Sequence, residues 1–381
     1  MGRVARIGLL TLAFWGALLV CLSGTAAHAD TGPTLPISHS GRWLTDAAGR
    51  VVIIHGVNIV EKRAPYSPDS HGFNPGVGKF IQSLGFNGAR LGLLWAGVEP
   101  SAGVYDQQYV NQVHADADTL ASDGVMSLVD FHQDLMNEQF GGEGFPTWAV
   151  QSDGLPAQPL TGFPLSYASS PGENAAWLNF YNNARDAEGI GLQDSYAKAW
   201  QFAAASFASD RSLIGYDLIN EPWSLVTNAP LCVLGCAGFE HGTLAPFEAR
   251  VMRSIRGSDP QHLLFYEPVV ETQFGLGAYD MPNPDRDPEA AMSYHAYCLV
   301  SGGSCPGSER RAFENGLNDA SANGDAGLLS EFGATNDLSL VQPLIADADA
   351  KMEGWMWWAP NLTGYFSDSY TDLAANDPQW P

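Results

Sequence analysis

The feature of this sequence that most constrains its fold is a regular alternation between two kinds of segment. Short stretches rich in apolar, β-branched or aromatic residues alternate with longer stretches that place apolar residues at helical spacing. The strand-like stretches are residues 51–58, 88–93, 125–131, 213–220, 262–266, 291–297, 327–330 and 354–358. The clearest helical patterns cover residues 109–122, 195–208, 245–256 and 338–351.

Eight strands that alternate with helices predict an α/β protein with a parallel sheet, and eight is the number of strands that closes a (β/α)8 TIM barrel. A doubly wound open sheet is the alternative. The sequence contains no G-x-G-x-x-G and no G-x-x-x-x-G-K-[ST], so nothing supports nucleotide binding on such a sheet. The alternation therefore favours the barrel.

The first thirty residues have the three-part pattern of a secretory signal. Two arginines precede an apolar run at 7–22, and Ala27-His28-Ala29 offers small residues for cleavage. A membrane anchor is the alternative, but the run is short for a span. Cys21 could indicate a lipoprotein, although the residue before it is a bulky valine. We expect a signal peptide at 1–29, a secreted protein, and one catalytic domain at 30–381.

The predicted mature chain is strongly acidic. Without its two signal-peptide arginines it carries 16 basic against 42 acidic side chains, a net charge of about −26. Nucleic acid is an unsuitable partner, because binding it requires clustered Lys and Arg to neutralise phosphates. Anionic membrane surfaces should also repel the chain. Excess charge keeps a secreted protein soluble, and we expect a monomer with no obligatory protein partner.

Four cysteines remain after the predicted cleavage, arranged as two close pairs. Cys232 with Cys236, and Cys298 with Cys305, suggest two local disulfides in an exported chain. A zinc site is the alternative, but no C-x-x-C is present. We expect no metal and no organic cofactor.

Several polar and aromatic residues stand at the carboxyl ends of the predicted strands, where side chains of a TIM barrel face the active site. A long connection rich in Gly, Pro and aromatic residues, 133–177, follows the third strand and is predicted to form one wall of a cleft. The strand-end residues are Arg90, Asp130, His132, Asp134, Asn220, Glu221, Trp223, Glu267, His295, Tyr297, Glu331, Trp357 and Trp358.

Glu221 and Glu331 follow strands four and seven, which face each other across the barrel mouth. Two carboxyl groups are the minimal apparatus for breaking a glycosidic bond, because one protonates the departing oxygen while the other attacks the anomeric carbon or activates water. A separation of about 5–5.5 Å indicates retention of configuration and a wider one indicates inversion. Arg90 and Tyr297 could keep Glu331 ionised, whereas Glu221 needs a raised pKa to act as the acid.

Neighbouring residues suit sugar binding. Asn220 could hydrogen-bond a sugar hydroxyl, and Trp358 offers a flat apolar face on which a ring can stack. Trp223, Leu225 and the 133–177 connection could line an apolar trough beside Glu221. Glu267 ends the fifth strand and could line the same pocket.

With Asn220-Glu221-Pro222 the sequence resembles glycoside hydrolase family 5, in which Asn-Glu-Pro on strand four carries the acid/base and strand seven carries the nucleophile. The resemblance implies Glu221 as acid/base and Glu331 as nucleophile. The set that matches the family pattern in order is Arg90, His132, Asn220, Glu221, His295, Tyr297, Glu331 and Trp358.

A closer resemblance, over about 51–358, is to the bacterial endoglycoceramidases of that family. It rests on VEP at 98–100, GVYDQQY at 103–109, DFHQD at 130–134, PTWA at 146–149, DGLP at 153–156 and YAKAW at 196–200. It implies hydrolysis of the β-linkage between an oligosaccharide and ceramide, with Lys62, Asp130 and Asn220 contacting the first sugar. Such proteins often carry a β-sandwich after the barrel, and with the last residue at Pro381 we expect no complete one.

Four other functions remain open. An endo-β-1,4-glucanase or a β-glycosidase of sterol or flavonoid glycosides would use the same glutamate pair. A carbohydrate-binding protein on a barrel that has lost catalysis would have no need to keep both Glu221 and Glu331. Acyl transfer is the weakest alternative, because the sequence contains no G-x-S-x-G.

Overall fold

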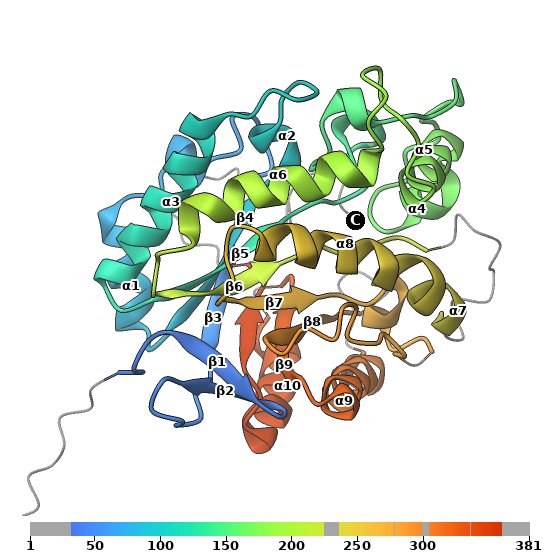
Figure 1. The fold of residues 1–381 in the computed structure, drawn as a ribbon. Coiled ribbons are helices and arrows are strands. Elements are labelled where there is room, and N and C mark those ends of the chain that lie inside the picture. Colours follow the sequence, from blue (N-terminus) through green and yellow to red (C-terminus); the bar gives the residue numbers. More distant parts are fainter. Residues whose placement is uncertain (1–31, 225–235, 278, 299–304, 336, 360–381) are drawn as a thin grey trace, which may run out of the picture. The chain divides into compact units, whose positions relative to one another are not determined.

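The computed structural model describes residues 32–224, 236–277, 279–298, 305–335 and 337–359. Within the unit that begins at Pro33, eight parallel strands close a barrel in the order β10-β3-β4-β5-β6-β7-β8-β9, with helices packed around it (Figure 1). The strands are β3 His55–Ile59, β4 Gly88–Leu93, β5 Met126–Phe131, β6 Leu213–Asp217, β7 Leu263–Tyr266, β8 Ala290–Ala296, β9 Ala326–Phe332 and β10 Trp355–Trp357. The predicted (β/α)8 TIM barrel is confirmed. The predicted signal peptide at 1–29 lies outside the described residues.

The helices follow the strands as the alternation predicts. They are α1 Pro75–Ser83, α2 Trp95–Val98, α3 Gln107–Ser122, α4 Leu165–Ser169, α5 Pro171–Tyr181, α6 Leu192–Phe207, α7 Ala237–Phe239, α8 Ala245–Arg256, α9 Pro306–Asn323 and α10 Leu338–Lys351. Short helical turns are η1 Pro68–His71, η2 Glu138–Phe140, η3 Thr147–Ala149, η6 Glu240–Leu244 and η7 Val270–Phe274. Across the described ranges we find no helix with the length and apolar character that crossing a membrane requires.

Side-chain caps fix where several of these helices begin. The side chains of Asn74, Asp106, Ser170 and Asp337 accept hydrogen bonds from backbone N–H groups in the first turns of α1, α3, α5 and α10. These N–H groups have no partner within a helix, so a capping oxygen satisfies them. The caps orient the helices that pack on the outside of the barrel.

The barrel interior is a packed apolar core at its amino-terminal end. Every residue of β4, β5, β8 and β9 is buried, as expected for parallel strands covered on both faces. A hairpin of β1 Ile37–Ser40 and β2 Trp43–Asp46 precedes the barrel, and its Ile37 and Leu44 belong to the interior cluster. The hairpin therefore closes the amino-terminal end of the barrel, and the site lies at the other end.

The structure departs from the sequence-based elements in a few places. The first predicted strand, 51–58, begins only at His55, and the fourth ends at Asp217 rather than residue 220. The β1–β2 hairpin, α1 and α9 are not among the predicted elements. The 133–177 connection is not devoid of secondary structure, since it contains η2, η3, α4 and most of α5.

Candidate active site

Glu221 lies just beyond β6 in a strained backbone conformation. Its φ of 47° is left-handed, which is uncommon for a residue other than glycine and costs of order 1–3 kcal/mol. Three hydrogen bonds hold this turn. The Glu221 N–H donates to Oε2 of Glu267 at 2.8 Å, and Nε2 of Gln133 donates to the carbonyls of Asn220 and Glu221 at 2.7 and 3.0 Å. The surrounding fold thus determines where the Glu221 side chain points.

Glu331 lies on β9 and is held by two strong donors. Nη1 of Arg90 donates to Oε1 at 2.5 Å, and the Tyr297 hydroxyl donates to Oε2 at 3.0 Å. Arg90 is fully buried, and Glu331 is nearly so. Both contacts predicted for this carboxylate are present.

The two glutamates meet around His295. Nδ1 of His295 lies 2.8 Å from Oε1 of Glu221 and 3.7 Å from Oε2 of Glu331. One carboxylate oxygen of each glutamate and a His295 ring nitrogen all lie within 4.8 Å of one another. Glu221 Oε2 is buried and has no hydrogen-bond partner among the described residues. This leaves one oxygen of Glu221 available to another molecule.

The electrostatic surroundings shift the pKa values of Glu221 and His295. Burial raises the pKa of Glu221 to about 7, against the opposing effect of the His295 contact. Burial alone would lower the pKa of His295, but the nearby Glu331 and Glu267 carboxylates outweigh it and hold the pKa well above its usual value. Around neutral pH, Glu221 is therefore able to hold a proton and release it.

Arg90 organizes the floor of the site. It is the central cation for carboxylates that end four strands. Its guanidinium contacts Asp217 at 2.8 Å, Asp130 at 3.1 Å, Glu267 at 3.1 Å and Glu331 at 2.5 Å, and it donates to Oδ1 of Asn220 at 2.8 Å. Burial and the neighbouring Glu267 raise the pKa of Asp217 well above its usual value. The remaining carboxylates are held in fixed positions around one planar donor.

A second cation, Lys62, occupies one side of the mouth. Its ammonium group forms ion pairs with Asp134 and, at 3.3 Å, with Glu143. The same nitrogen lies 4.7 Å from the centre of the Trp358 ring. Although burial opposes it, Lys62 holds the pKa of Asp134 well below its usual range, while burial raises the pKa of Glu143 to about 8. Of the two carboxyl groups, Asp134 therefore keeps the charge.

His132 links this cluster to the floor. Nδ1 lies 2.8 Å from Oδ2 of Asp130, and Nε2 lies 3.3 Å from Oδ2 of Asp134. Its ring stacks on Trp358 with centroids 5.2 Å apart. The predicted site residues Lys62, Asp130, His132 and Trp358 are thus brought together at one side of the two glutamates.

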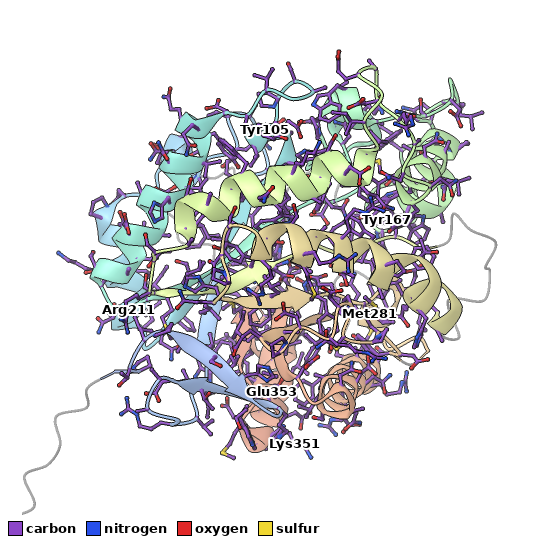
Figure 2. All side chains as sticks on the ribbon, in the orientation of Figure 1. Tyr105, Tyr167, Arg211, Met281, Lys351 and Glu353 are labelled. Carbon is purple, nitrogen blue, oxygen red and sulfur yellow. A yellow bond between two sulfur atoms is a disulfide. The ribbon has the colours of Figure 1, made fainter. Side chains whose placement is uncertain are left out.

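Trp223 lies two residues after Glu221 and packs against the 133–177 connection. The Trp223 ring stacks on Tyr167 of α4 with centroids 4.8 Å apart, and its Nε1 donates to Oδ1 of Asn174 of α5 at 3.1 Å. Tyr167, labelled in Figure 2, accepts a hydrogen bond from the Leu135 N–H at 3.0 Å. The predicted wall thus contacts the segment that carries Glu221, while Leu225 lies outside the described residues.

One predicted disulfide is present, between Cys298 and Cys305. It connects the residue after Tyr297 to the start of α9, so it restrains the chain next to the group that binds Glu331. The other predicted pair, Cys232 with Cys236, lies outside the described residues because of Cys232.

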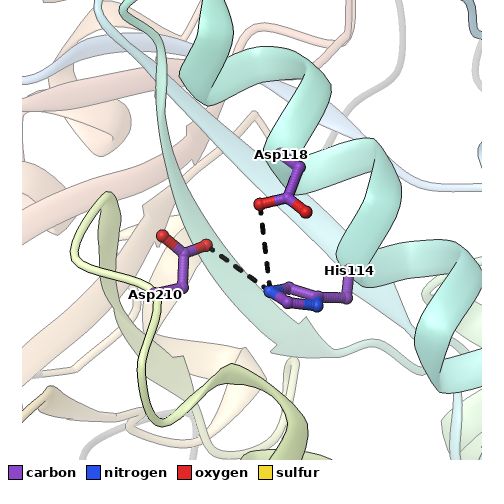
Figure 3. A group of neighbouring side chains, drawn as sticks. All are labelled: His114, Asp118 and Asp210. Carbon is purple, nitrogen blue, oxygen red and sulfur yellow. Dashed lines mark ion pairs between the residues drawn. The ribbon is translucent and has the colours of Figure 1, made fainter.

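Three histidine–carboxylate groups in the described ranges have ligand-like spacing. Glu221, His295 and Glu331 form the first, and His132, Asp134 and Glu143 form the second, where the Lys62 ammonium supplies a cation. The third, His114 with Asp118 and Asp210, lies outside the site and joins α3 to the turn before β6 (Figure 3). Its His114 Nε2 lies 4.0 Å from Asp118 and 3.9 Å from Asp210.

Some members of the cluster escaped the sequence-based prediction. Gln133 stands two residues after the third strand, so its position near a strand end was a usable signal. Glu143 and Tyr167 lie within the long connection, and no local pattern distinguishes them. Their contacts with Lys62 and Trp223 depend on the path of that connection.

A closed (β/α)8 barrel with two neighbouring buried glutamates at its mouth defines the class of this protein as a glycoside hydrolase. The family described as Cellulase (glycosyl hydrolase family 5) matches residues 46–363. The chain therefore belongs to glycosyl hydrolase family 5.

Several relatives that match most of this chain are endoglycoceramidases. One from Cyanea nozakii is 30% identical over 373 residues, which cover 89% of this chain and 72% of the relative. Endoglycoceramidase I from Rhodococcus hoagii is 28% identical over 354 residues, covering 88% and 70%. The solved structure of endo-glycoceramidase II from Rhodococcus sp. as a lactosyl-enzyme intermediate superimposes with a TM-score of 0.70 at 27% identity, over 88% of this chain and 77% of that one.

Proposed function

We propose that this chain is a secreted, retaining β-glycosidase of the endoglycoceramidase type, which hydrolyses the bond between an oligosaccharide and ceramide. Its relatives named endoglycoceramidase, matched over most of their length, support this substrate class. The lactosyl-enzyme intermediate of the Rhodococcus sp. enzyme supports a covalent route.

The observation that carries the proposed mechanism is the short separation of Glu221 and Glu331. Their nearest carboxylate oxygens lie within 4.8 Å. This fits a retaining enzyme, with about 5–5.5 Å between its carboxyl groups, better than an inverting one, which needs about 6.5–9.5 Å to hold a water. Their surroundings support different roles, because Arg90 and Tyr297 donate hydrogen bonds to both oxygens of Glu331 while burial raises the pKa of Glu221.

In the first step of this mechanism, the Glu331 carboxylate attacks the anomeric carbon as Glu221 gives its proton to the glycosidic oxygen. The bond to ceramide breaks, ceramide leaves as the alcohol, and the sugar stays on Glu331 as an ester. In the second step, the Glu221 carboxylate takes a proton from water as that water attacks the anomeric carbon. The oligosaccharide leaves, and both glutamates return to their starting states.

The resemblance to endoglycoceramidases supports the proposed binding roles. In this proposal Lys62, Asp130 and Asn220 bind the first sugar, and Trp358 offers it an apolar face. Trp223, stacked on Tyr167 beside Glu221, lies on the side where the ceramide departs. His295 holds one oxygen of Glu221, which leaves Oε2 to meet the glycosidic oxygen.

The substrate class is tested by comparing two assays on the same preparation. We expect intact lactose to be released from lactosylceramide, with little hydrolysis of carboxymethylcellulose. Activity on the cellulose derivative alone would contradict the endoglycoceramidase assignment and favour an endoglucanase. Glu331→Gln is the matched control, because it keeps the size of the side chain and removes the nucleophile.

The mechanism is tested by trapping its intermediate. A dinitrophenyl 2-deoxy-2-fluoro-β-lactoside should inactivate the enzyme and add one fluorolactosyl group to the peptide that contains Glu331, as read by mass spectrometry. Labelling of any other residue would overturn the nucleophile assignment. Glu331→Gln should remain unlabelled.

The proposal that the protein is secreted rests on the signal pattern at 1–29. Expressed in a bacterial host with a general secretion pathway, the chain should leave the cytoplasm and begin at Asp30. Amino-terminal sequencing of the exported protein checks this. An exported or retained chain that still begins at Met1 would contradict it.

A further inference from the structure

Glu267 directly follows β7. Its carboxylate contacts the backbone N–H of Glu221, the guanidinium of Arg90 and the ring of His295. Oε2 accepts a hydrogen bond from the Glu221 N–H at 2.8 Å, and Oε1 accepts one from Nη2 of Arg90 at 3.1 Å. Oε1 also lies 3.4 Å from Nε2 of His295. The side chain is 2% exposed, so these contacts are shielded from water. No substrate group needs to reach Glu267 for it to affect Glu221.

The contact with Glu221 coincides with the strained point of the chain. Glu221 has a left-handed φ of 47°, and its N–H points at the Glu267 carboxylate. A residue in this conformation persists only where its surroundings hold it. The segment that follows Glu267 adds a second restraint, because the Val270 N–H donates a hydrogen bond to the Pro222 carbonyl at 3.0 Å. Together, these bonds attach the Glu221 turn to the end of β7.

The chemistry of the contacts requires a carboxylate rather than an amide. The Glu221 N–H and the Arg90 guanidinium can only donate hydrogen bonds, and each uses a different oxygen of Glu267. A carboxamide has one accepting end, so its NH₂ would oppose either the backbone of Glu221 or the guanidinium of Arg90. An aspartate keeps the charge but is one methylene shorter.

We infer that Glu267 is a positioning residue for the acid/base, holding the strained backbone of Glu221 and the ring of His295 so that the Glu221 carboxyl group faces the glycosidic oxygen. This inference rests on the proposed function. It deepens that function by assigning control of proton transfer to a residue outside the glutamate pair. Glu267 does so through Glu221 and His295, without touching the sugar.

The test uses two aryl lactosides of similar shape whose leaving groups differ in their need for a proton. Phenol leaves poorly unless protonated, whereas 2,4-dinitrophenol leaves without help. General acid catalysis contributes about 10²–10⁴-fold. We therefore expect Glu267→Gln to lower kcat/KM by about a hundredfold or more on phenyl β-lactoside and by less than about tenfold on the dinitrophenyl compound. Glu267→Asp should fall between Glu267→Gln and the unsubstituted enzyme on the phenyl substrate.

Azide provides a second measurement. On the dinitrophenyl substrate it should raise kcat of Glu267→Gln and yield β-lactosyl azide, because an anion needs no general base to attack the covalent intermediate. A loss of folded protein would lower the activity on both lactosides by the same factor. Active-site titration, which measures the burst of dinitrophenol, corrects for such a loss. Equal losses on both lactosides, or no loss, would overturn the inference.

Glu248→Gln is the matched control. The side chain of Glu248, on α8, accepts a hydrogen bond from the backbone N–H of Glu267 at 3.1 Å. It is not one of the three groups that the Glu267 carboxylate contacts. Its substitution should change kcat/KM on both lactosides by the same factor, and a leaving-group preference like that of Glu267→Gln would contradict the inference. If the unsubstituted enzyme cleaves neither lactoside, the proposed function fails; if it cleaves both and Glu267→Gln shows no preference, only this inference fails.

Discussion

Glu221 and Glu331 are the same residue type in two different surroundings. Glu331 accepts hydrogen bonds from Arg90 and Tyr297, which stabilise a negative charge. Glu221 is buried, has one oxygen near His295 and one without a partner among the described residues, and has its pKa raised to about 7. Opposite requirements are thus met by neighbours that come from different strands.

The pKa of Glu221 predicts the basic side of the pH profile. The acid must be protonated to assist departure of the leaving group, so kcat/KM should fall as the pH rises through about 7. Initial rates on a glycolipid between pH 5 and 9 measure this. On a dinitrophenyl glycoside, whose leaving group needs no proton, the unsubstituted enzyme should lack this basic limb. A profile on the glycolipid that stays flat up to pH 9 would contradict the assignment.

At this scale the sequence was informative wherever a residue lay in the second half of a barrel strand or just after one, or close to these positions. Arg90, Tyr297 and Glu331 were predicted to lie together because parallel strands deliver their carboxyl ends to one face of the barrel. The contacts of Lys62 with Glu143 could not be predicted this way. Glu143 lies within a long connection, and the pairing depends on how that connection returns to the barrel.

The connection after β5 is the element that most shapes the mouth. Asp134 and Glu143 bond to each other through their backbones at 2.8 and 3.2 Å and both contact Lys62. Between them, Gly142 comes so close to the carbonyl oxygen of Asp134 that a Cβ would stand 1.7 Å from it. The connection can close on itself there only because that residue is glycine.

Gly142→Ala should therefore disturb the element and the site together. The clash must push Asp134 away from Glu143, and overpacking of this kind destabilises a protein by about 1–3 kcal/mol. We expect kcat/KM to fall at least about tenfold, because both ion-pair partners of Lys62 shift. Gly307→Ala is the control, since a Cβ there meets nothing within 4 Å. Urea unfolding and initial rates measure both effects, and unchanged activity for Gly142→Ala would show that the loop adapts.

The elements found from sequence and those missed differ in their packing. Strands such as β4 are buried on both faces and give short apolar runs, and α8 buries one face, so its apolar residues follow a clear helical period. α9 has a weaker apolar period than α8, and the β1–β2 hairpin has four-residue strands. The long connection is held by specific contacts, such as the stacking of Tyr167 on Trp223. Such contacts produce no periodic pattern in the sequence.

The whole molecule combines a net charge of −24 at pH 7 with carboxyl groups that the fold buries. Burial raises the pKa of Glu173 and Glu240 to about 8 and that of Glu353 to about 7, from an ordinary value of 4.5. In the other direction, backbone hydrogen bonding and the Arg50 contact lower the pKa of Asp46. The buried acids are neutral inside the folded protein over a pH range in which the unfolded chain would ionise them.

These shifts predict how stability depends on pH. A carboxyl group whose pKa is raised in the folded state contributes fully to the free energy of unfolding below about pH 4.5. This contribution is lost as the pH rises through 7 to 8. Asp46 acts oppositely, but only below its ordinary value of 3.8. The free energy of unfolding should therefore be larger at pH 5 than at pH 8, by about 1.4 kcal/mol per pH unit for each fully buried group.

Calorimetry at constant ionic strength tests this prediction, with a higher Tm expected at pH 5 than at pH 8. Glu173→Gln is the informative variant, because its amide stays neutral at every pH while keeping the shape of the side chain. Its Tm should depend less steeply on pH than that of the unsubstituted protein. Self-repulsion of the acidic surface acts in the same direction but is screened by salt, whereas the contribution of buried groups is screened much less. A Tm difference that disappears in high salt would therefore assign the effect to the surface charge instead of the buried acids.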